Sequence, residues 1–175
     1  MEKQFNEIKA AYADFSRELL KNGKLPIKDT GIGYWSIAVC DEIFALFNRM
    51  NLSQYHSFVD LGSGDGRVTL IASLFTKAHG IEFDPELHAK SMEMKDKLGL
   101  DAQFYHGDFL KQDLSNYALL FIHPDQHINK KLEGKLLREM NGKLLVHGPL
   151  YHPSTLKKTN VHDVFGMLSS EWIKP

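Results

Sequence analysis

The chain has 175 residues, a length that suits one domain with one sizeable hydrophobic core. Hydrophobic residues make up 43% and charged residues 25%, a balance that excludes wholesale disorder, and the net charge of -1 argues against a polybasic nucleic-acid binder. The single cysteine, Cys40, excludes an intramolecular disulfide and a cysteine zinc cluster. We see no secretory signal and no apolar run of the roughly 20 residues that a membrane helix needs, so we expect a cytoplasmic protein.

Residues 1–50 are predicted to form an N-terminal helical extension. In its first part an apolar stripe repeats at alternating steps of three and four, the spacing of an amphipathic helix: Phe5, Ile8, Tyr12, Phe15 and Leu19. Gly23 and Pro26 end this helix, and residues 29–33 form a turn-rich loop. A second amphipathic helix is predicted over residues 36–50. Core packing is the expected role of the first stripe, with a partner interface as the alternative.

From Ser57 onward, short apolar strands alternate with helices. Strands are predicted over residues 58–61, 78–82, 102–106, 118–122 and 143–147, and helices over 67–75, from Pro85 onward, and over 129–140. This alternation is typical of a mostly parallel central sheet flanked by helices, so we predict an α/β fold in a single domain over residues 1–175. The tail, residues 161–173, is predicted to form one or two short strands.

A glycine loop follows the first of these strands and precedes a helix. It reads Asp60-Leu61-Gly62-Ser63-Gly64-Asp65-Gly66-Arg67. Glycines at 62 and 64 allow a sharp turn and a close approach of the backbone to a ligand, because neither residue has a Cβ. The third glycine comes two residues after the second, whereas the dinucleotide loop G-x-G-x-x-G has a longer last interval. A nicotinamide dinucleotide is therefore the weaker candidate ligand.

This loop resembles motif I of the class I S-adenosylmethionine-dependent methyltransferases, and the resemblance extends over residues 57–148. It implies a Rossmann-like fold, S-adenosylmethionine as the cofactor, and a loop of Gly62, Ser63, Gly64 and Gly66 around it. By the same resemblance, Asp60 would help to hold the amino group of the cofactor's methionine part. The alternative role of these glycines is a simple turn after a strand; the strand before the loop and the helix after it favour the cofactor loop.

Two further positions resemble the family in the right order along the chain. Glu82 ends the second strand and is followed by Phe83, and a carboxylate there would accept hydrogen bonds from both ribose hydroxyls. After the third strand, Asp108 would accept the adenine amino group, and the adjacent Phe109 would pack on the adenine ring. A solvated strand end or a turn is the alternative role for each acid.

The segment after the fourth strand reads Phe121-Ile122-His123-Pro124-Asp125-Gln126-His127. Methyltransferases that act on DNA adenine or on glutamine usually carry Asn-Pro-Pro-aromatic here, and this chain lacks the asparagine and the aromatic residue. In spacing, the chain is more similar to small single-domain protein-lysine methyltransferases, including archaeal ones. That resemblance implies a lysine side chain of a protein as methyl acceptor, and it makes a nucleic-acid substrate a weak candidate.

The candidate catalytic residues are His123, Asp125 and Tyr151. His123, Asp125 and His147 are candidate proton acceptors, and Tyr151, with Tyr34 and Trp35, is a candidate wall of an aromatic channel; packing is the alternative role of these aromatic residues. A dry channel helps a lysine to lose its proton, because burial disfavours the ammonium ion.

No metal site is predicted, although a magnesium ion at Asp125, as in catechol-type O-methyltransferases, stays an alternative. A small-molecule N- or O-methyltransferase and a non-catalytic, S-adenosylmethionine-binding docking subunit are the alternative functions. If the protein is a lysine methyltransferase, we expect its active site to have an open mouth. If it is a small-molecule enzyme, we expect a closed pocket with the N-terminal helices as a lid.

Among the remaining histidines, His56, His79 and His88 are expected at the surface or in structural positions where their ring nitrogens have hydrogen-bond partners. The oligomeric state is not defined by the sequence.

Overall fold

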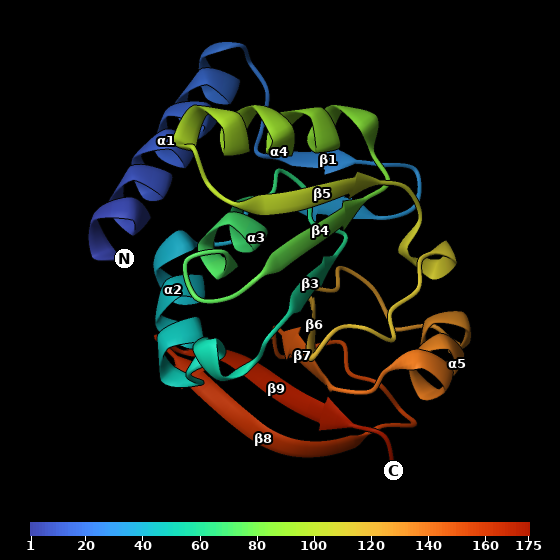
Figure 1. The fold of residues 1–175 in the computed structure, drawn as a ribbon. Coiled ribbons are helices and arrows are strands. Elements are labelled where there is room, and N and C mark those ends of the chain that lie inside the picture. Colours follow the sequence, from blue (N-terminus) through green and yellow to red (C-terminus); the bar gives the residue numbers. More distant parts are fainter.

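A seven-stranded sheet runs through the centre of the molecule, and the computed structural model describes all 175 residues (Figure 1). Its strands lie in the order β5 (Ala102–His106), β4 (Ala78–Glu82), β3 (Phe58–Leu61), β6 (Leu119–Ile122), β7 (Lys143–His147), β9 (Met167–Ile173), β8 (Lys157–Val164). The first five strands are parallel, and β9 is antiparallel to both of its neighbours. The predicted mostly parallel sheet is therefore confirmed.

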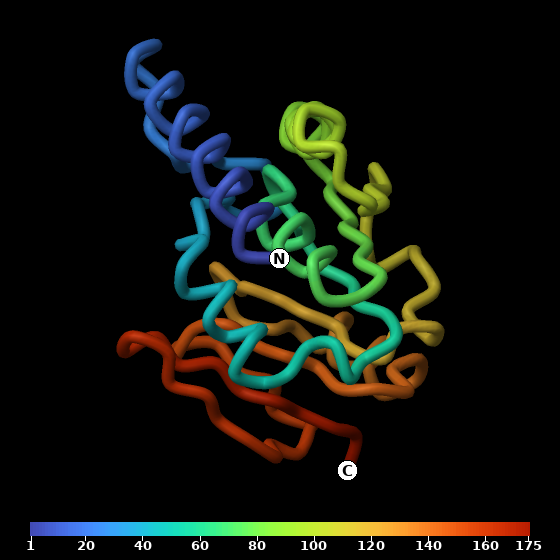
Figure 2. Tube along the Cα trace, turned by 60° about the vertical axis from the view of Figure 1, so that its left-hand side comes forward, coloured from blue at the N-terminus to red at the C-terminus, as the bar shows by residue number.

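Helices cover the two faces of this sheet unequally (Figures 1 and 2). One face packs against α1 (Glu2–Lys21), α2 (Cys40–Arg49), α3 (Arg67–Ala72) and α4 (Pro85–Leu98), with the short 3-10 helix η1 (Leu52–Gln54) at the end of α2. The other face packs against α5 (Lys130–Glu139) and the 3-10 helix η2 (Phe109–Lys111). The second face thus carries less helix, and loops complete its cover.

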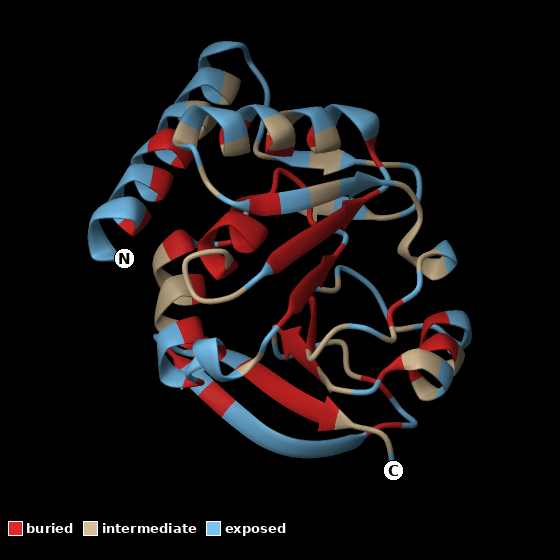
Figure 3. Cartoon of the chain, viewed as in Figure 1, coloured by how far each residue is buried: buried red, intermediate tan, exposed pale blue.

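The central strands are buried along their whole length (Figure 3). Side chains of a strand point alternately to its two faces, so β3 sends Phe58 into one core and Val59 into the other, and β6 does the same with Phe121 and Leu120. Burial on both faces explains why these strands read as continuous apolar runs in the sequence. No helix combines the length and the apolar character that crossing a bilayer requires.

The segment before α2 differs from the sequence-based expectation. The predicted helix over residues 36–50 is shorter, since α2 begins at Cys40; Ser36 ends a small hairpin of β1 (Ile27–Asp29) and β2 (Tyr34–Ser36), and residues 37–39 connect the two elements. The predicted turn-rich loop joins the two strands: the Asp29 carboxylate accepts the Gly31 N–H at 2.8 Å, and the Thr30 hydroxyl donates to the Gly33 carbonyl at 2.7 Å. These local bonds favour a turn over the continuation of a helix.

The tail also differs from the expectation of one or two short strands. It forms two long antiparallel strands, and β8 begins at Lys157 rather than near Val161. All residues of β8 from Lys157 to Val161 are exposed, so this stretch lacks the apolar pattern that marks a buried strand. A strand at the edge of a sheet needs little apolar surface, which is why the sequence pattern missed its start.

Helix α1 buries Phe5, Ile8 and Tyr12 in the core, which confirms a packing role for its apolar stripe, and Tyr12 also contacts a buried ion pair at the glycine loop. The Arg67 guanidinium bonds both carboxylate oxygens of Asp65, at 2.5 Å for the shortest contact, and also donates to the Ala38 carbonyl at 3.1 Å. Tyr12 of α1 donates its hydroxyl to the Asp65 carbonyl at 2.7 Å, and its ring lies 4.7 Å from the guanidinium carbon.

Removing the arginine from this pair should strongly destabilise the fold. In an Arg67→Met variant the Asp65 carboxyl group, only 2% exposed, would be left in the core without its partner. Breaking a buried pair in this way typically costs about 3–5 kcal/mol, and we expect the free energy of unfolding in urea to fall by that amount. The double variant Asp65→Asn/Arg67→Met has no unpaired charge and should recover much of the loss. Equal destabilisation of the single and double variants would contradict this account.

Candidate active site

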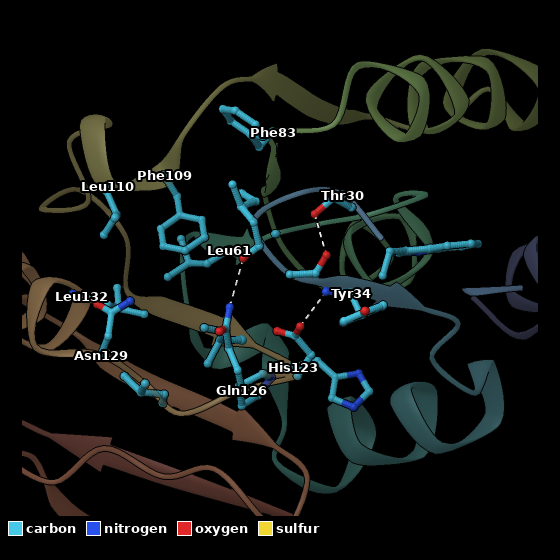
Figure 4. A pocket seen from close by; sticks show the side chains of 18 of the residues that line it. Thr30, Tyr34, Leu61, Phe83, Phe109, Leu110, His123, Gln126, Asn129 and Leu132 are labelled. Carbon is cyan, nitrogen blue, oxygen red and sulfur yellow. Dashed lines mark hydrogen bonds between the residues drawn. The ribbon is translucent and has the colours of Figure 1, made fainter. Parts of the chain in front are cut away.

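Two cavities that share part of their walls open at the carboxyl ends of the central parallel strands. Figure 4 shows the residues that line the larger one. The larger has a volume of about 430 Å³ and is lined by residues that follow β3, β4, β5 and β6. The smaller has a volume of about 90 Å³ and lies against the glycine loop. Both are lined by Tyr34, Trp35, Gly62, His123, Pro124 and Asp125. In an α/β sheet of this kind, ligands bind at this edge.

The glycine loop has the backbone shape that its sequence predicts. Gly64 has φ +55°, a conformation that residues with a side chain rarely adopt. A Cβ at this position would lie 2.6 Å from Nε1 of Trp35, so the indole ring packs directly on the loop backbone. Gly66 caps the amino end of α3 and lines neither cavity, since Ser91 and Phe104 cover it. Gly62, Ser63 and Gly64 line the smaller cavity.

Glu82 joins the glycine loop to the strand beside it. One carboxylate oxygen accepts the Gly64 N–H and the other accepts the Asp84 N–H, each at 2.7 Å. Burial raises the pKa of the Glu82 carboxyl, and these backbone donors oppose that rise. A carboxylate has about four acceptor positions, so Glu82 can also accept a hydroxyl donor in the larger cavity, which it lines.

Asp60 lies at the end of β3, on the wall of the smaller cavity, and is only 3% exposed. The Thr69 hydroxyl donates to its carboxylate at 3.2 Å. Burial raises the pKa of the Asp60 carboxyl to about 8, and the Thr69 hydrogen bond only partly offsets this. Ser63, on the same wall, has a buried hydroxyl without a hydrogen-bond partner. The smaller cavity therefore presents a neutral acid and an unpaired hydroxyl, both suited to a polar ligand.

The far end of the larger cavity is apolar with one acid. Phe83, Phe109 and Leu110 line it, and Asp108 follows β5 beside them (Figure 4). Asp108 caps η2, because its carboxylate accepts the Leu110 N–H at 2.8 Å. Apolar and aromatic side chains with an acid beside them are the residue types that suit a flat ring with a polar edge.

His123 borders both cavities just beyond β6. Its ring lies 4.8 Å from the ring of His147, edge to face, and His147 Nδ1 lies 2.8 Å from the Ser169 hydroxyl oxygen. Burial lowers the pKa of His123, and burial followed by the charge of His123 lowers the pKa of His147 to about 3. His123 is therefore a neutral imidazole at neutral pH and can accept a proton, while His147 supports its ring from behind.

The other two predicted catalytic residues lie in different surroundings. Asp125 lines both cavities, and its carboxylate accepts the backbone N–H of Tyr34 at 2.5 Å. Tyr151 lines neither cavity, and its ring packs edge to face on His127 with 5.1 Å between the centroids. His127 does line the larger cavity, so Tyr151 stands behind its wall.

Some residues at the site carried no sequence signal. Gln126 and Asn129 line the larger cavity, and nothing in a polar loop marks such residues in advance.

No group of three or more His, Cys, Asp or Glu side chains is arranged to hold a metal ion. His79 and His88 each have one buried ring nitrogen without a partner, so the expectation of satisfied structural histidines holds only in part. His79 Nδ1 does bond the Tyr117 hydroxyl, at 2.8 Å.

A family model described as the ANTKMT methyltransferase domain matches residues 60–147, just over half of the chain. The match begins at the buried acid of β3 and ends at the last residue of β7, so it contains the ends of β3, β4, β5 and β6 at the two cavities but not the β1–β2 hairpin. The chain belongs to this family. The prediction of a class I S-adenosylmethionine-dependent methyltransferase is thereby confirmed. Comparison with curated protein sequences gives no match.

Solved structures share the fold of this methyltransferase. An RNA methyltransferase from Salinibacter ruber, in complex with S-adenosyl-L-homocysteine, has a TM-score of 0.70 and 21% identity, over 79% of this chain and 94% of that one. The mitomycin 7-O-methyltransferase MmcR has a TM-score of 0.63 and 14% identity, over 77% and 53% of the two chains. A Pyrococcus abyssi tRNA (uracil-54, C5)-methyltransferase, also in complex with S-adenosyl-L-homocysteine, has a TM-score of 0.62 and 11% identity, over 84% of this chain and 44% of that one. At these identities the likeness concerns the fold alone, since the named acceptors differ in kind.

Proposed function

We propose that this methyltransferase transfers a methyl group to lysine side chains of proteins. The observation that carries the proposal is the open mouth of the larger cavity. Its rim is formed by exposed side chains, among them Tyr34 at 60% and Phe83 at 45% exposure, and the first lining residue along the chain is Thr30. Helix α1 therefore takes no part in the cavity wall, whereas a closed small-molecule pocket predicts the N-terminal helices as its lid. The match to the ANTKMT family supports the same acceptor class.

The residues at the cavities fit S-adenosylmethionine along its length. Asp60, in its ionised form, would hold the ammonium group of the methionine part, beside Gly62, Ser63 and Gly64. Glu82 would accept the ribose hydroxyls at the junction of the two cavities. The adenine ring would lie between Phe83 and Phe109, with its amino group on Asp108. When bound, the cofactor supplies an electrophilic methyl group on a sulfonium centre.

The raised pKa of Asp60 predicts a pH-dependent affinity for the cofactor. With a pKa of about 8, the carboxyl is protonated at neutral pH, so binding the ammonium group requires the loss of one proton. The affinity should therefore rise by up to about tenfold per pH unit between about pH 6 and pH 7.5. Calorimetric titration with S-adenosylhomocysteine measures this slope. An Asp60→Asn variant should bind weakly with a flat profile, and a slope equal to that of the wild type would contradict the assignment.

A lysine acceptor must lose a proton before it can attack the methyl group. With an ordinary pKa near 10.4, deprotonation at pH 7 costs about 4–5 kcal/mol. The side chains around the passage lower that cost: Trp35 and Tyr34 replace water beside it, and burial disfavours the ammonium ion. His123, neutral at this pH and on the wall of both cavities, is placed to accept the proton. Orienting the amine toward the methyl group can supply up to about 7–11 kcal/mol of the rate enhancement.

The test uses a mixture of proteins as acceptor, with a matched sample whose lysines have been acetylated. We expect label from methyl-labelled S-adenosylmethionine to enter the untreated proteins as ε-N-methyl-lysine, identified by mass spectrometry, and not the acetylated ones. A His123→Ala variant should bind S-adenosylhomocysteine normally and label the proteins far more slowly.

Two outcomes would overturn the proposal. Equal labelling of the acetylated and untreated proteins would mean an acceptor other than lysine. Labelling confined to small molecules added as competing acceptors would favour the small-molecule alternative instead.

A further inference from the structure

We propose that Asp125 is a positioning residue that holds the β1–β2 hairpin (residues 27–36) against the cofactor site, and so fixes Trp35 as the wall of the methyl-acceptor passage. This role differs from that of a proton acceptor, which the sequence suggested for Asp125. The inference rests on the proposed cofactor site and is independent of which acceptor is methylated.

The hairpin is attached to the loop after β6 by two hydrogen bonds (Figure 4). Asp125 Oδ2 accepts the Tyr34 N–H at 2.5 Å, and Gln126 Nε2 donates to the Ile32 carbonyl at 3.0 Å. A Cβ placed on Gly33 would lie 3.0 Å from Asp125 Oδ2, so the hairpin backbone packs directly on the carboxylate. A side chain at this position would press on the carboxylate, so glycine favours the close approach.

A second attachment lies at the other strand of the hairpin. Lys28 Nζ contacts the Asp84 carboxylate, with a shortest distance of 2.8 Å, and the Glu86 carboxylate at 2.9 Å. Asp84 in turn caps α4 and donates its N–H to Glu82. The hairpin therefore bridges the strand ends of β4 and β6, with the cofactor site between them.

Trp35 is the residue that this bridge places. It lies between Tyr34 and Ser36 on β2, its ring packs on Gly64, and it lines both cavities. Few other contacts hold the hairpin, since its only strand pairing is between two strands of three residues each. Loss of the Asp125 bond should release the ring and widen the passage where the two cavities meet.

The chemistry of the bond offers a matched pair of variants. The bond needs an acceptor oxygen and no charge, so Asp125→Asn can keep it through the amide carbonyl, whereas Asp125→Ala cannot. A proton acceptor would show the opposite dependence, because an amide cannot take up a proton and would fail as completely as alanine. The two variants thus separate the two roles.

The experiment uses a Trp172→Phe background, in which Trp35 is the only tryptophan of the chain. The readouts are Trp35 emission, the rate of tryptic cleavage after Lys28, and the affinity for S-adenosylhomocysteine. We expect Asp125→Ala to shift the emission to the red, to raise cleavage roughly tenfold and to weaken binding by a similar factor, as for the loss of one hydrogen bond. Asp125→Asn should stay within about twofold of the background protein on all three. Circular dichroism checks that both variants are folded.

Two results would overturn the inference. One is an Asp125→Ala variant whose Trp35 emission and cleavage rate equal those of the background protein. The other is an Asp125→Asn variant that binds S-adenosylhomocysteine normally but is as slow in methyl transfer as Asp125→Ala, with the acidic limb of its pH profile lost; that result would restore Asp125 as a proton acceptor. Neither fluorescence nor cleavage needs a methyl acceptor, so a failure of the lysine proposal would leave these readouts unaffected.

Discussion

A Gly64→Val variant is expected to lose all measurable binding of S-adenosylhomocysteine while remaining folded. Two effects act together at this position. Gly64 has φ +55°, where a β-branched residue is strained, and its added Cβ would overlap the Trp35 ring. The Trp35 ring or the loop backbone must then shift, which disturbs a cavity wall in the first case and the Gly64 N–H bond to Glu82, 2.7 Å long, in the second. Isothermal titration calorimetry measures the loss, and circular dichroism reports the fold.

Gly99 provides the matched control. It has φ +60°, nearly the same backbone conformation, and a Cβ there would meet nothing within 4 Å. It ends α4 and lines neither cavity. A Gly99→Val variant should therefore carry the same strain and bind the ligand with wild-type affinity. If Gly64→Val retained an affinity within about tenfold of the wild type, the assignment of this loop to the cofactor would be wrong.

The central sheet could be predicted because its strands are buried on both faces. In β3 and β6 every residue is buried, and such strands leave short apolar runs that turn residues interrupt. The order of strands and helices then leaves few topologies, since crossovers between parallel strands are right-handed. For the same reason the acids at residues 60, 82 and 108 could be assigned to one edge of the sheet from their places at the ends of the expected strands.

The β1–β2 hairpin and the start of β8 could not be predicted in the same way. Each hairpin strand has three residues, too few for periodicity to show, and Tyr34 is exposed. What stabilises the hairpin is a bond to Asp125, which follows Tyr34 by 91 positions in the chain. A local pattern contains no information on such a contact. The same limit applies to Asp125 itself: its position after β6 was predictable, but its partner was not.

Glu82→Ala is expected to weaken binding of S-adenosylhomocysteine by at least about 100-fold. Two hydrogen bonds from the ribose hydroxyls to a charged acceptor would be lost, each worth about 1.5–3 kcal/mol. The variant would also leave the N–H groups of Gly64 and Asp84 without their acceptor, which loosens the glycine loop. Calorimetric titration of the folded variant, with the wild type in the same buffer, measures the loss.

Glu82→Gln separates the loop from the ribose. The glutamine side chain has one carbonyl oxygen, so it can accept the N–H of either Gly64 or Asp84. Its NH₂ group would then face the other N–H, and that hydrogen bond would be lost because both groups are donors. If Glu82 acts mainly through the backbone, the glutamine variant should be nearly as weak as alanine and less stable than the wild type. If it acts mainly through the ribose, the glutamine variant should keep intermediate affinity, because its carbonyl can still accept one hydroxyl. Wild-type affinity in both variants would exclude Glu82 from the cofactor site, because burial and backbone bonds alone would then explain its place at the end of β4.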